Sequence, residues 1–206
     1  MYPSDDSTLF LNKVYECICN CPNVIGLNND TLEDDDFIDK LKAKLESINE
    51  VIFLGHGSSD TLYGTNLNPL IDEQSGLIDY LKGKRNILFS CNSSRFINNF
   101  KIDDSIGFGF IPTSIDDVRG GKLKYIDISK MTVLNVDYFK NAIVNIWLNT
   151  IKESGISDLE RFYNSFRYYT NCEIVNCLMS NNRQSDKRII SDVLYTLKQE
   201  MILSNF

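Results

Sequence analysis

The chain has 206 residues, of which 43% are hydrophobic and 11% aromatic, so it is long and apolar enough to bury a sizeable core. Its 28 acidic and 21 basic residues give a formal net charge of −7, which repels phosphate backbones and argues against direct nucleic-acid binding. Acidic residues instead of a basic leader precede the first apolar stretch, and no run approaches about 18 consecutive apolar residues. We therefore expect no export signal, no membrane span, a cytoplasmic location and reduced thiols.

The first two predicted elements are a strand and a helix. Residues 12–19 (NKVYECIC) alternate in a strand-like way before a turn at NCPN. Residues 31–48 begin with Thr31 and a run of acids, which suits a helix N-terminus, and then place apolar side chains at helical spacing.

Three cysteines, Cys17, Cys19 and Cys21, lie at alternate positions in and just after the predicted strand. Structural zinc sites prefer pairs separated by two to four residues, and alternate residues of a strand do not wrap one ion easily. We therefore expect buried thiols here, with no metal and no other cofactor.

Three apolar runs then alternate with short helical segments. EVIFLG (50–55), RNILFSC (85–91) and DSIGFGFIPT (104–113) are typical of buried strands, and residues 75–84 and 93–100 of short helices. Strands that are apolar on both faces and alternate with helices favour an α/β fold, with a mostly parallel β-sheet sandwiched between helices.

The remainder of the chain is predicted to be mainly helical. Residues 120–129 alternate like an edge strand, and residues 171–179 are read as one further strand. Apolar stripes at helical spacing fall within 139–147, 159–166 and 190–201. No repeat and no linker rich in Gly, Pro or Ser divides the sequence, so we expect a single domain over 1–206.

A candidate catalytic pair follows the first two buried strands. His56, the only histidine, comes just after VIFLG, and Cys91 ends RNILFS, 35 residues further on. Carboxyl ends of neighbouring parallel strands meet at one edge of the sheet, so the two side chains should lie close together. An imidazole can take the proton of a thiol and return it to a leaving amine, which makes an acyl-transfer site. The backbone N–H groups of Gly57 and Cys91 are the candidate oxyanion donors, since Gly57 lets a carbonyl approach closely.

These motifs resemble a known family. A strand ending in GHG, a second ending in FSC with small polar residues after it, and a third reading SIGFGFIP are similar to the caspase-like cysteine proteases, most closely the bacterial CHAT-type proteases. The resemblance covers about residues 50–150. It implies a caspase-like αβα sandwich, a catalytic dyad of His56 and Cys91, a protein substrate and no metal. It also implies a role in bacterial defence or signalling, with a regulatory protein partner that switches the protease on.

Substrate specificity and function each leave an alternative open. The resemblance implies that the loop PTSIDDVRGG lines the specificity pocket, where Asp116 and Asp117 would favour a basic side chain, but two solvated loop carboxylates explain the pattern equally well. No third partner for the dyad can be assigned, and a backbone carbonyl would suffice to orient the imidazole. The rival function is a catalytically silent module of the same fold that binds a partner in an assembly.

Overall fold

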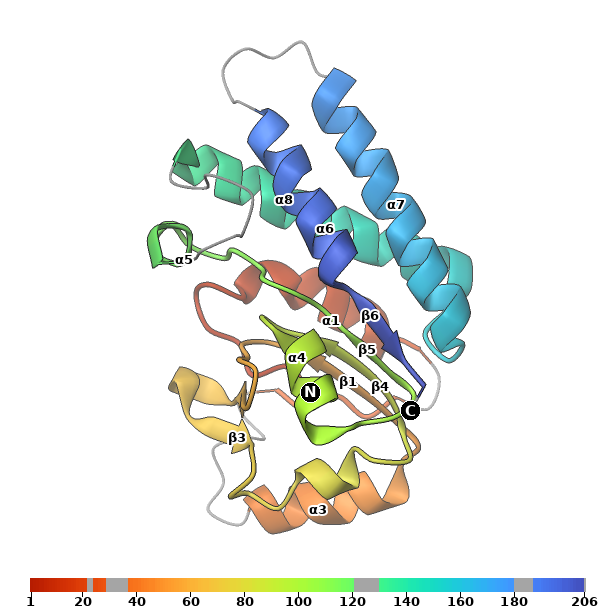
Figure 1. Ribbon diagram of the computed structural model, residues 1–206. Coiled ribbons are helices and arrows are strands. Elements are labelled where there is room, and N and C mark those ends of the chain that lie inside the picture. The colour runs from red at the N-terminus through yellow and green to blue at the C-terminus, as the bar shows by residue number, and fades with distance from the viewer. Residues whose placement is uncertain (22–23, 29–36, 121–129, 180–186, 206) are drawn as a thin grey trace. The chain divides into compact units, whose positions relative to one another are not determined.

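The computed structural model describes residues 1–21, 24–28, 37–120, 130–179 and 187–205 (Figure 1). The chain forms two compact units, of which the first contains Met1–Gly109 and Met201–Phe206 and the second Phe110–Glu200. The first unit combines a sheet with helices, whereas the second contains helices. The single domain over residues 1–206 stays a prediction.

The first unit is built on a four-stranded sheet in the order β1-β4-β5-β6. Strands β1, β4 and β5 are parallel, and β6 pairs antiparallel with β5. The mostly parallel α/β sheet is thus confirmed, and its caspase-like form stays a prediction. The strands are β1 (Glu50–Leu54), β4 (Arg85–Phe89), β5 (Ser105–Gly107) and β6 (Ile202–Ser204).

Helices cover both faces of this sheet, with α4 in front of it and α1 behind it in Figure 1. Apart from η2 (Thr65–Leu67) in the hairpin that follows β1, the described helices of the first unit are η1 (Leu9–Leu11), α1 (Asn12–Cys19), α3 (Phe37–Ser47), η3 (Ile78–Tyr80) and α4 (Ser93–Phe100). On one face, Phe53 and Leu88 are buried in a cluster with Leu41 of α3 and Ile97 of α4. A Cβ on Gly107 would lie 2.7 Å from the Ser94 backbone, so glycine lets α4 pack directly on β5.

The N-terminal segment runs beside β1 in the parallel sense. The Met1 nitrogen donates to the Ile52 carbonyl (2.6 Å), and the Leu54 N–H donates to the Met1 carbonyl (2.9 Å). A Cβ on Gly55 would lie 3.2 Å from Pro3, so the two chains stay close beyond the end of β1. Residues 4–8 are thereby carried to the same end of the sheet as the residues that follow β1.

A short hairpin follows β1, and the sequence did not predict it. It consists of β2 (Leu62–Tyr63), η2 (Thr65–Leu67) and β3 (Pro69–Ile71). The Tyr63 N–H donates to the His56 carbonyl (3.0 Å), which ties the start of the loop to the hairpin. The predicted helix over 75–84 is reduced to the single turn of η3.

Two segments that the sequence predicts to be strands are helices in the structure, so both predictions are wrong. Residues 12–19 form α1, in which Val14 and Ile18 are the buried positions, four residues apart as on one face of a helix. Residues 171–179 are the last turns of α7, where Cys177 continues the buried stripe of Phe166 and Thr170. In both segments the apolar residues fit a period of two as well as one of 3.6, and burial favours the longer period.

The second unit contains α5 (Ile115–Gly120), α6 (Val133–Ser154), α7 (Leu159–Met179) and α8 (Lys187–Glu200). The three predicted helical stripes are confirmed by the last three of these helices. Trp147 of α6 is fully buried against Phe162 and Phe166 of α7, with ring centroids 5.2 and 5.9 Å away. The predicted edge strand over 120–129 lies outside the described residues, apart from Gly120 at the end of α5. Within the described ranges, no helix has both the length and the apolar composition that a membrane crossing requires.

Candidate active site

His56 and Cys91 follow neighbouring parallel strands. Leu54 of β1 lies opposite Phe89 of β4, and the Gly55 N–H continues the ladder by donating to the Phe89 carbonyl (3.1 Å). His56 comes two residues after Leu54, and Cys91 two residues after Phe89. Both residues therefore lie at the same end of the sheet, which we call the carboxyl edge (residues 55–57 and 90–92).

The two halves of the carboxyl edge are packed tightly against each other at Gly57. A Cβ placed on Gly57 would collide with the Ser90 Oγ, and it would lie 2.9 Å from the Ser90 Cβ and 3.2 Å from the Cys91 carbonyl oxygen. Only glycine leaves room for this contact. The role of the Gly57 and Cys91 N–H groups as oxyanion donors stays a prediction.

His56 is held by two side chains from the N-terminal segment. Its Nε2 lies 2.7 Å from Asp5 Oδ2 and 2.9 Å from Ser7 Oγ. Neither of these hydrogen bonds involves Cys91. The sequence predicted neither partner, because Asp5 is 51 residues away and no local pattern joins the two positions.

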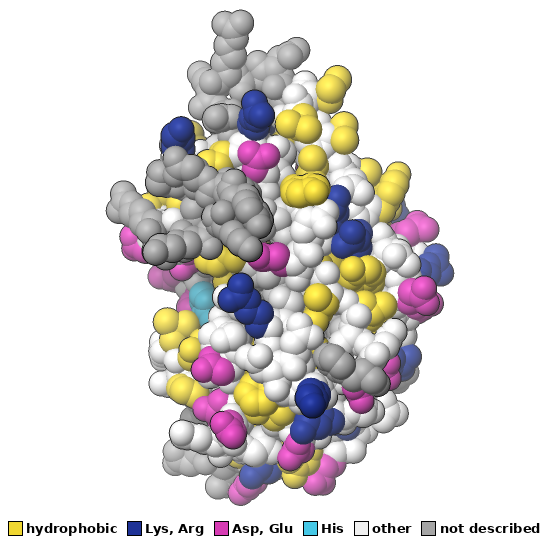
Figure 2. Space-filling view, in the orientation of Figure 1, with side chains coloured by type: hydrophobic (Ala, Val, Ile, Leu, Met, Phe, Trp, Pro, Cys, Tyr) yellow, Lys and Arg dark blue, Asp and Glu magenta, His cyan; other side chains and the backbone are white. Residues whose placement is uncertain are grey.

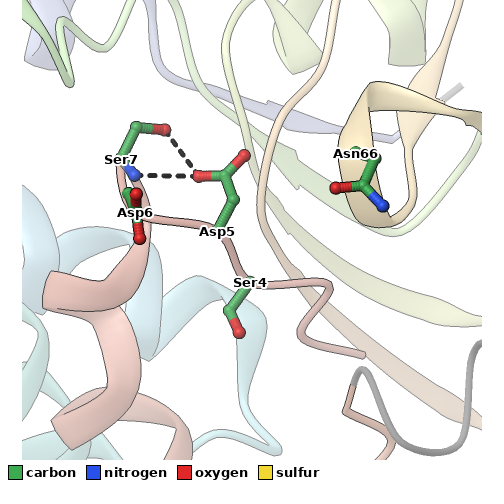
Figure 3. Close-up of a pocket in the computed structure, with 5 residues that line it drawn as sticks. All are labelled: Ser4, Asp5, Asp6, Ser7 and Asn66. Atoms are coloured by element: carbon green, nitrogen blue, oxygen red, sulfur yellow. Dashed lines mark hydrogen bonds between the residues drawn. The ribbon is translucent and has the colours of Figure 1, made fainter.

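Asp5 is itself fixed by a turn. Its Oδ1 accepts hydrogen bonds from the Ser7 N–H (2.9 Å), the Ser7 hydroxyl (2.8 Å) and the Thr8 N–H (3.2 Å); Figure 3 shows the two Ser7 bonds. Burial alone would raise the pKa of the Asp5 carboxyl, but the hydrogen bonds from Ser7 and Thr8 and the charge of His56 outweigh it and lower that pKa. Asp5 is therefore ionised at neutral pH.

The arrangement around His56 does not form a Ser-His-Asp triad. In such a triad the carboxylate and the hydroxyl bond to opposite nitrogens of the ring, so that a proton can pass between them. Here Asp5 and Ser7 both approach Nε2, and the Ser7 hydroxyl also donates to Asp5. Ser7 is consequently placed to hold the carboxylate and the ring, and it is not placed as a nucleophile.

An open pocket adjoins this cluster. Its volume is about 440 Å³, and the residues that line it are all polar. In Figure 3, Asn66 of the hairpin faces the N-terminal turn across this space. The His56 side chain is 21% exposed and that of Asp5 33%, and the single cyan side chain in Figure 2 shows part of the imidazole at the surface. The lining residues are Ser4, Asp5, Asp6, Ser7 and Asn66.

The turn that carries Cys91 is held by the small polar residues around it. The Ser93 hydroxyl donates to the Leu88 carbonyl and accepts from the Phe108 N–H (2.9 Å), while the Asn92 N–H donates to the Gly109 carbonyl (2.9 Å). Cys91 is partly exposed and not in a disulfide. Beside it, the Ser90 hydroxyl is buried without a hydrogen-bond partner among the described residues.

The two aspartates predicted to read the substrate lie in α5, in the second unit. The Asp117 carboxylate accepts from the Thr113 N–H (3.0 Å) and from the Thr113 hydroxyl (2.7 Å), so it holds the start of its own helix. Contact of Asp116 and Asp117 with a substrate stays a prediction.

The cysteines near the N-terminus are placed differently from the prediction. Cys17 and Cys19 lie in α1 and Cys21 just after it, and all three are partly exposed instead of buried in a strand. Burial raises the pKa of the Cys17 thiol, and the neighbouring Cys21 adds to this effect. In the part of the chain that the structure describes, no group of three or more histidine, cysteine or acidic residues is arranged to hold a metal ion.

The fold and the site together define a mixed α/β protein with a histidine and a cysteine at the carboxyl edge of its sheet. Comparisons with protein-family models, with curated proteins and with solved structures find no match to the chain.

Proposed function

We propose that the chain is a caspase-like cysteine endopeptidase in which Cys91 is the nucleophile and His56 the general acid and base. The observation that carries the proposal is the register of β1 and β4, which brings both residues to one edge. Two further features support it. The imidazole is held by an ionised carboxylate, and Cys91 is partly exposed at the same edge of the sheet.

The proposed reaction transfers the acyl group of the substrate first to Cys91 and then to water. His56 takes the proton of the Cys91 thiol, and the thiolate attacks the carbonyl carbon of the scissile peptide bond. The Gly57 and Cys91 N–H groups stabilise the oxyanion, and removal of one such donor typically costs about 10²- to 10³-fold in rate. His56 then protonates the leaving amine as the C–N bond breaks, which leaves the acyl group on Cys91 as a thioester. In the second half, His56 takes a proton from water as the water oxygen attacks the thioester carbonyl, the C–S bond breaks, and His56 returns the proton to the Cys91 thiolate.

The proposal includes a protein substrate and a protein partner that switches the enzyme on, in bacterial defence or signalling. The pocket lined by Ser4–Ser7 and Asn66 offers space for substrate, and its lining includes Asp5 and Ser7, the hydrogen-bond partners of His56. An extended peptide would bind along the sheet, with its scissile carbonyl at the carboxyl edge.

The test is cleavage of a peptide library by the full chain, alone and together with the proteins encoded next to it. The Cys91→Ala variant should lose all cleavage, whereas Cys172→Ala, which removes a partly exposed thiol of α7, should cleave like the wild type. Cleavage that survives Cys91→Ala would remove the proposed nucleophile. If the wild type cleaves nothing even with its neighbours, the silent partner-binding module is the better account.

A further inference from the structure

We propose that Asp5 is a positioning residue that holds His56 as the tautomer protonated on Nε2, so that Nδ1 is the nitrogen that serves as the base. The choice of tautomer rests on the geometry of the N-terminal segment and on the ionised state of the Asp5 carboxylate. The assignment of Nδ1 as the base for Cys91 rests on the proposed function.

The hydrogen bonds at Nε2 determine which nitrogen carries the proton. An ionised carboxylate can only accept hydrogen bonds, so the 2.7 Å contact with Asp5 Oδ2 requires a proton on Nε2. The Ser7 hydroxyl donates its own proton to Asp5 Oδ1 (2.8 Å), which leaves its oxygen lone pairs directed at Nε2. Both neighbours therefore accept from the same N–H, and the lone pair of the neutral ring is on Nδ1.

Asp5 is held in place independently of His56. The buried Tyr2 hydroxyl donates to the Thr8 carbonyl (2.9 Å), and the Asp5 carbonyl accepts from the Thr8 N–H (3.0 Å). Together with the pairing of Met1 beside β1, these bonds close a turn around the carboxylate. A carboxylate fixed in this way orients the ring before any substrate binds, which lowers the entropic cost of the reactive geometry.

The two ring nitrogens of His56 therefore have different roles in the proposed catalysis. The proton that leaves the Cys91 Sγ goes to Nδ1 and later to the leaving amine. The Nε2 proton stays between His56 and Asp5, and Asp5 remains ionised and stabilises the imidazolium. Asp5 thus acts only through His56.

The test is nitrogen and proton NMR of the full chain labelled with ¹⁵N in its single histidine, at a pH at which the imidazole is neutral. In the wild type we expect a protonated Nε2, an unprotonated Nδ1, and an Nε2 proton that is shifted downfield and exchanges slowly with water. Asp5→Ala should move this proton upfield and speed its exchange. Asp6→Ala is the matched control, because Asp6 lines the same pocket but is not a hydrogen-bond partner of His56.

A proton on Nδ1 in the wild type, or an Nε2 proton unchanged in Asp5→Ala, would overturn the inference. If Asp5→Ala fails to fold, Asp5→Asn keeps the size of the side chain without its charge and should show a smaller shift in the same direction. The backbone spectrum of each variant reports whether it is folded.

A second readout separates the inference from the proposed function. The rate at which a peptide electrophile alkylates Cys91 should fall about 10- to 100-fold in Asp5→Ala, because the base is less well oriented. If the NMR result is as expected but His56→Ala leaves this rate unchanged, the positioning of the ring stands and the proposed function fails. If the Nε2 proton is unaffected by Asp5→Ala while His56→Ala slows Cys91, the positioning role fails and the function stands.

Discussion

Two regions differ in the side chains at their centres: the carboxyl edge of the first unit, and the contact between α6 and α7 in the second unit. At the carboxyl edge, the side chains of His56 and Cys91 are polar or reactive and partly exposed. In the second unit, Trp147 and Phe162 are fully buried against each other. Buried aromatic packing stabilises the second region, whereas partly exposed side chains at the carboxyl edge contribute little to stability. The proposed function accounts for their presence at that edge. Substitutions in the two regions should therefore have different effects.

The largest expected effect on stability comes from Trp147→Ala. The indole is fully buried and fills the contact between α6 and α7, so its removal leaves a cavity. We expect a loss of about 3–5 kcal/mol in the free energy of unfolding, measured by urea denaturation. Tyr168→Ala is the control, since that ring is 62% exposed on α7 and should change stability by no more than about 0.5 kcal/mol. Equal losses in the two variants would contradict the packing described for the second unit.

Gly57→Ala is expected to lose less stability than Trp147→Ala but to reduce the reactivity of the Cys91 thiol more. The added methyl collides with the Ser90 side chain, so the His56 loop or the Cys91 turn has to move, at a cost of about 1–3 kcal/mol. Alkylation of Cys91 by a peptide electrophile should slow at the same time.

A second substitution checks that this effect comes from the contact itself. Ser90→Gly removes the atoms with which the methyl collides, so the double variant should recover part of the stability lost in Gly57→Ala. Additive effects of the two substitutions would show that the halves of the carboxyl edge are not packed as described.

The smallest expected effect is the dependence of stability on pH through Asp5. Its pKa is lowered in the folded chain, so its contribution to stability is present above the unfolded pKa, near pH 4, and is lost as the pH falls through the folded value. Asp5→Asn should therefore be less stable than the wild type at pH 7, by about 1 kcal/mol or less because the carboxylate is one-third exposed. The difference should shrink as the pH is lowered below about 4, as urea unfolding at pH 7 and at pH 2 would measure. A difference that is the same at both pH values would contradict an ionised Asp5 paired with His56.

Much of the fold was predictable from the sequence because it depends on long or strongly apolar segments. The apolar runs VIFL in β1 and ILF in β4 have no polar interruption, and the stripes of α6, α7 and α8 extend over several turns. Short elements were less predictable. The three-residue β6 pairs with β5 about 100 positions earlier in the chain, and a segment that short carries no periodic signal of its own.

The candidate site was predictable only in part, for a related reason. His56 and Cys91 each follow a recognisable strand, so the rule for parallel sheets brings them to one edge. Asp5 and Ser7 belong to a segment that joins the site by backbone pairing of Met1 with β1. Such long-range pairing depends on the whole fold, and a window of neighbouring residues contains no trace of it.

The most direct test of the account is the reaction of the intact chain with a thiol-directed peptide electrophile, with the modified residue mapped by mass spectrometry. The account predicts that Cys91 is labelled much faster than the partly exposed Cys17 and Cys172, and that His56→Ala abolishes this preference. Labelling of Cys91 that is no faster than that of the other thiols, or that is unchanged in His56→Ala, would contradict it.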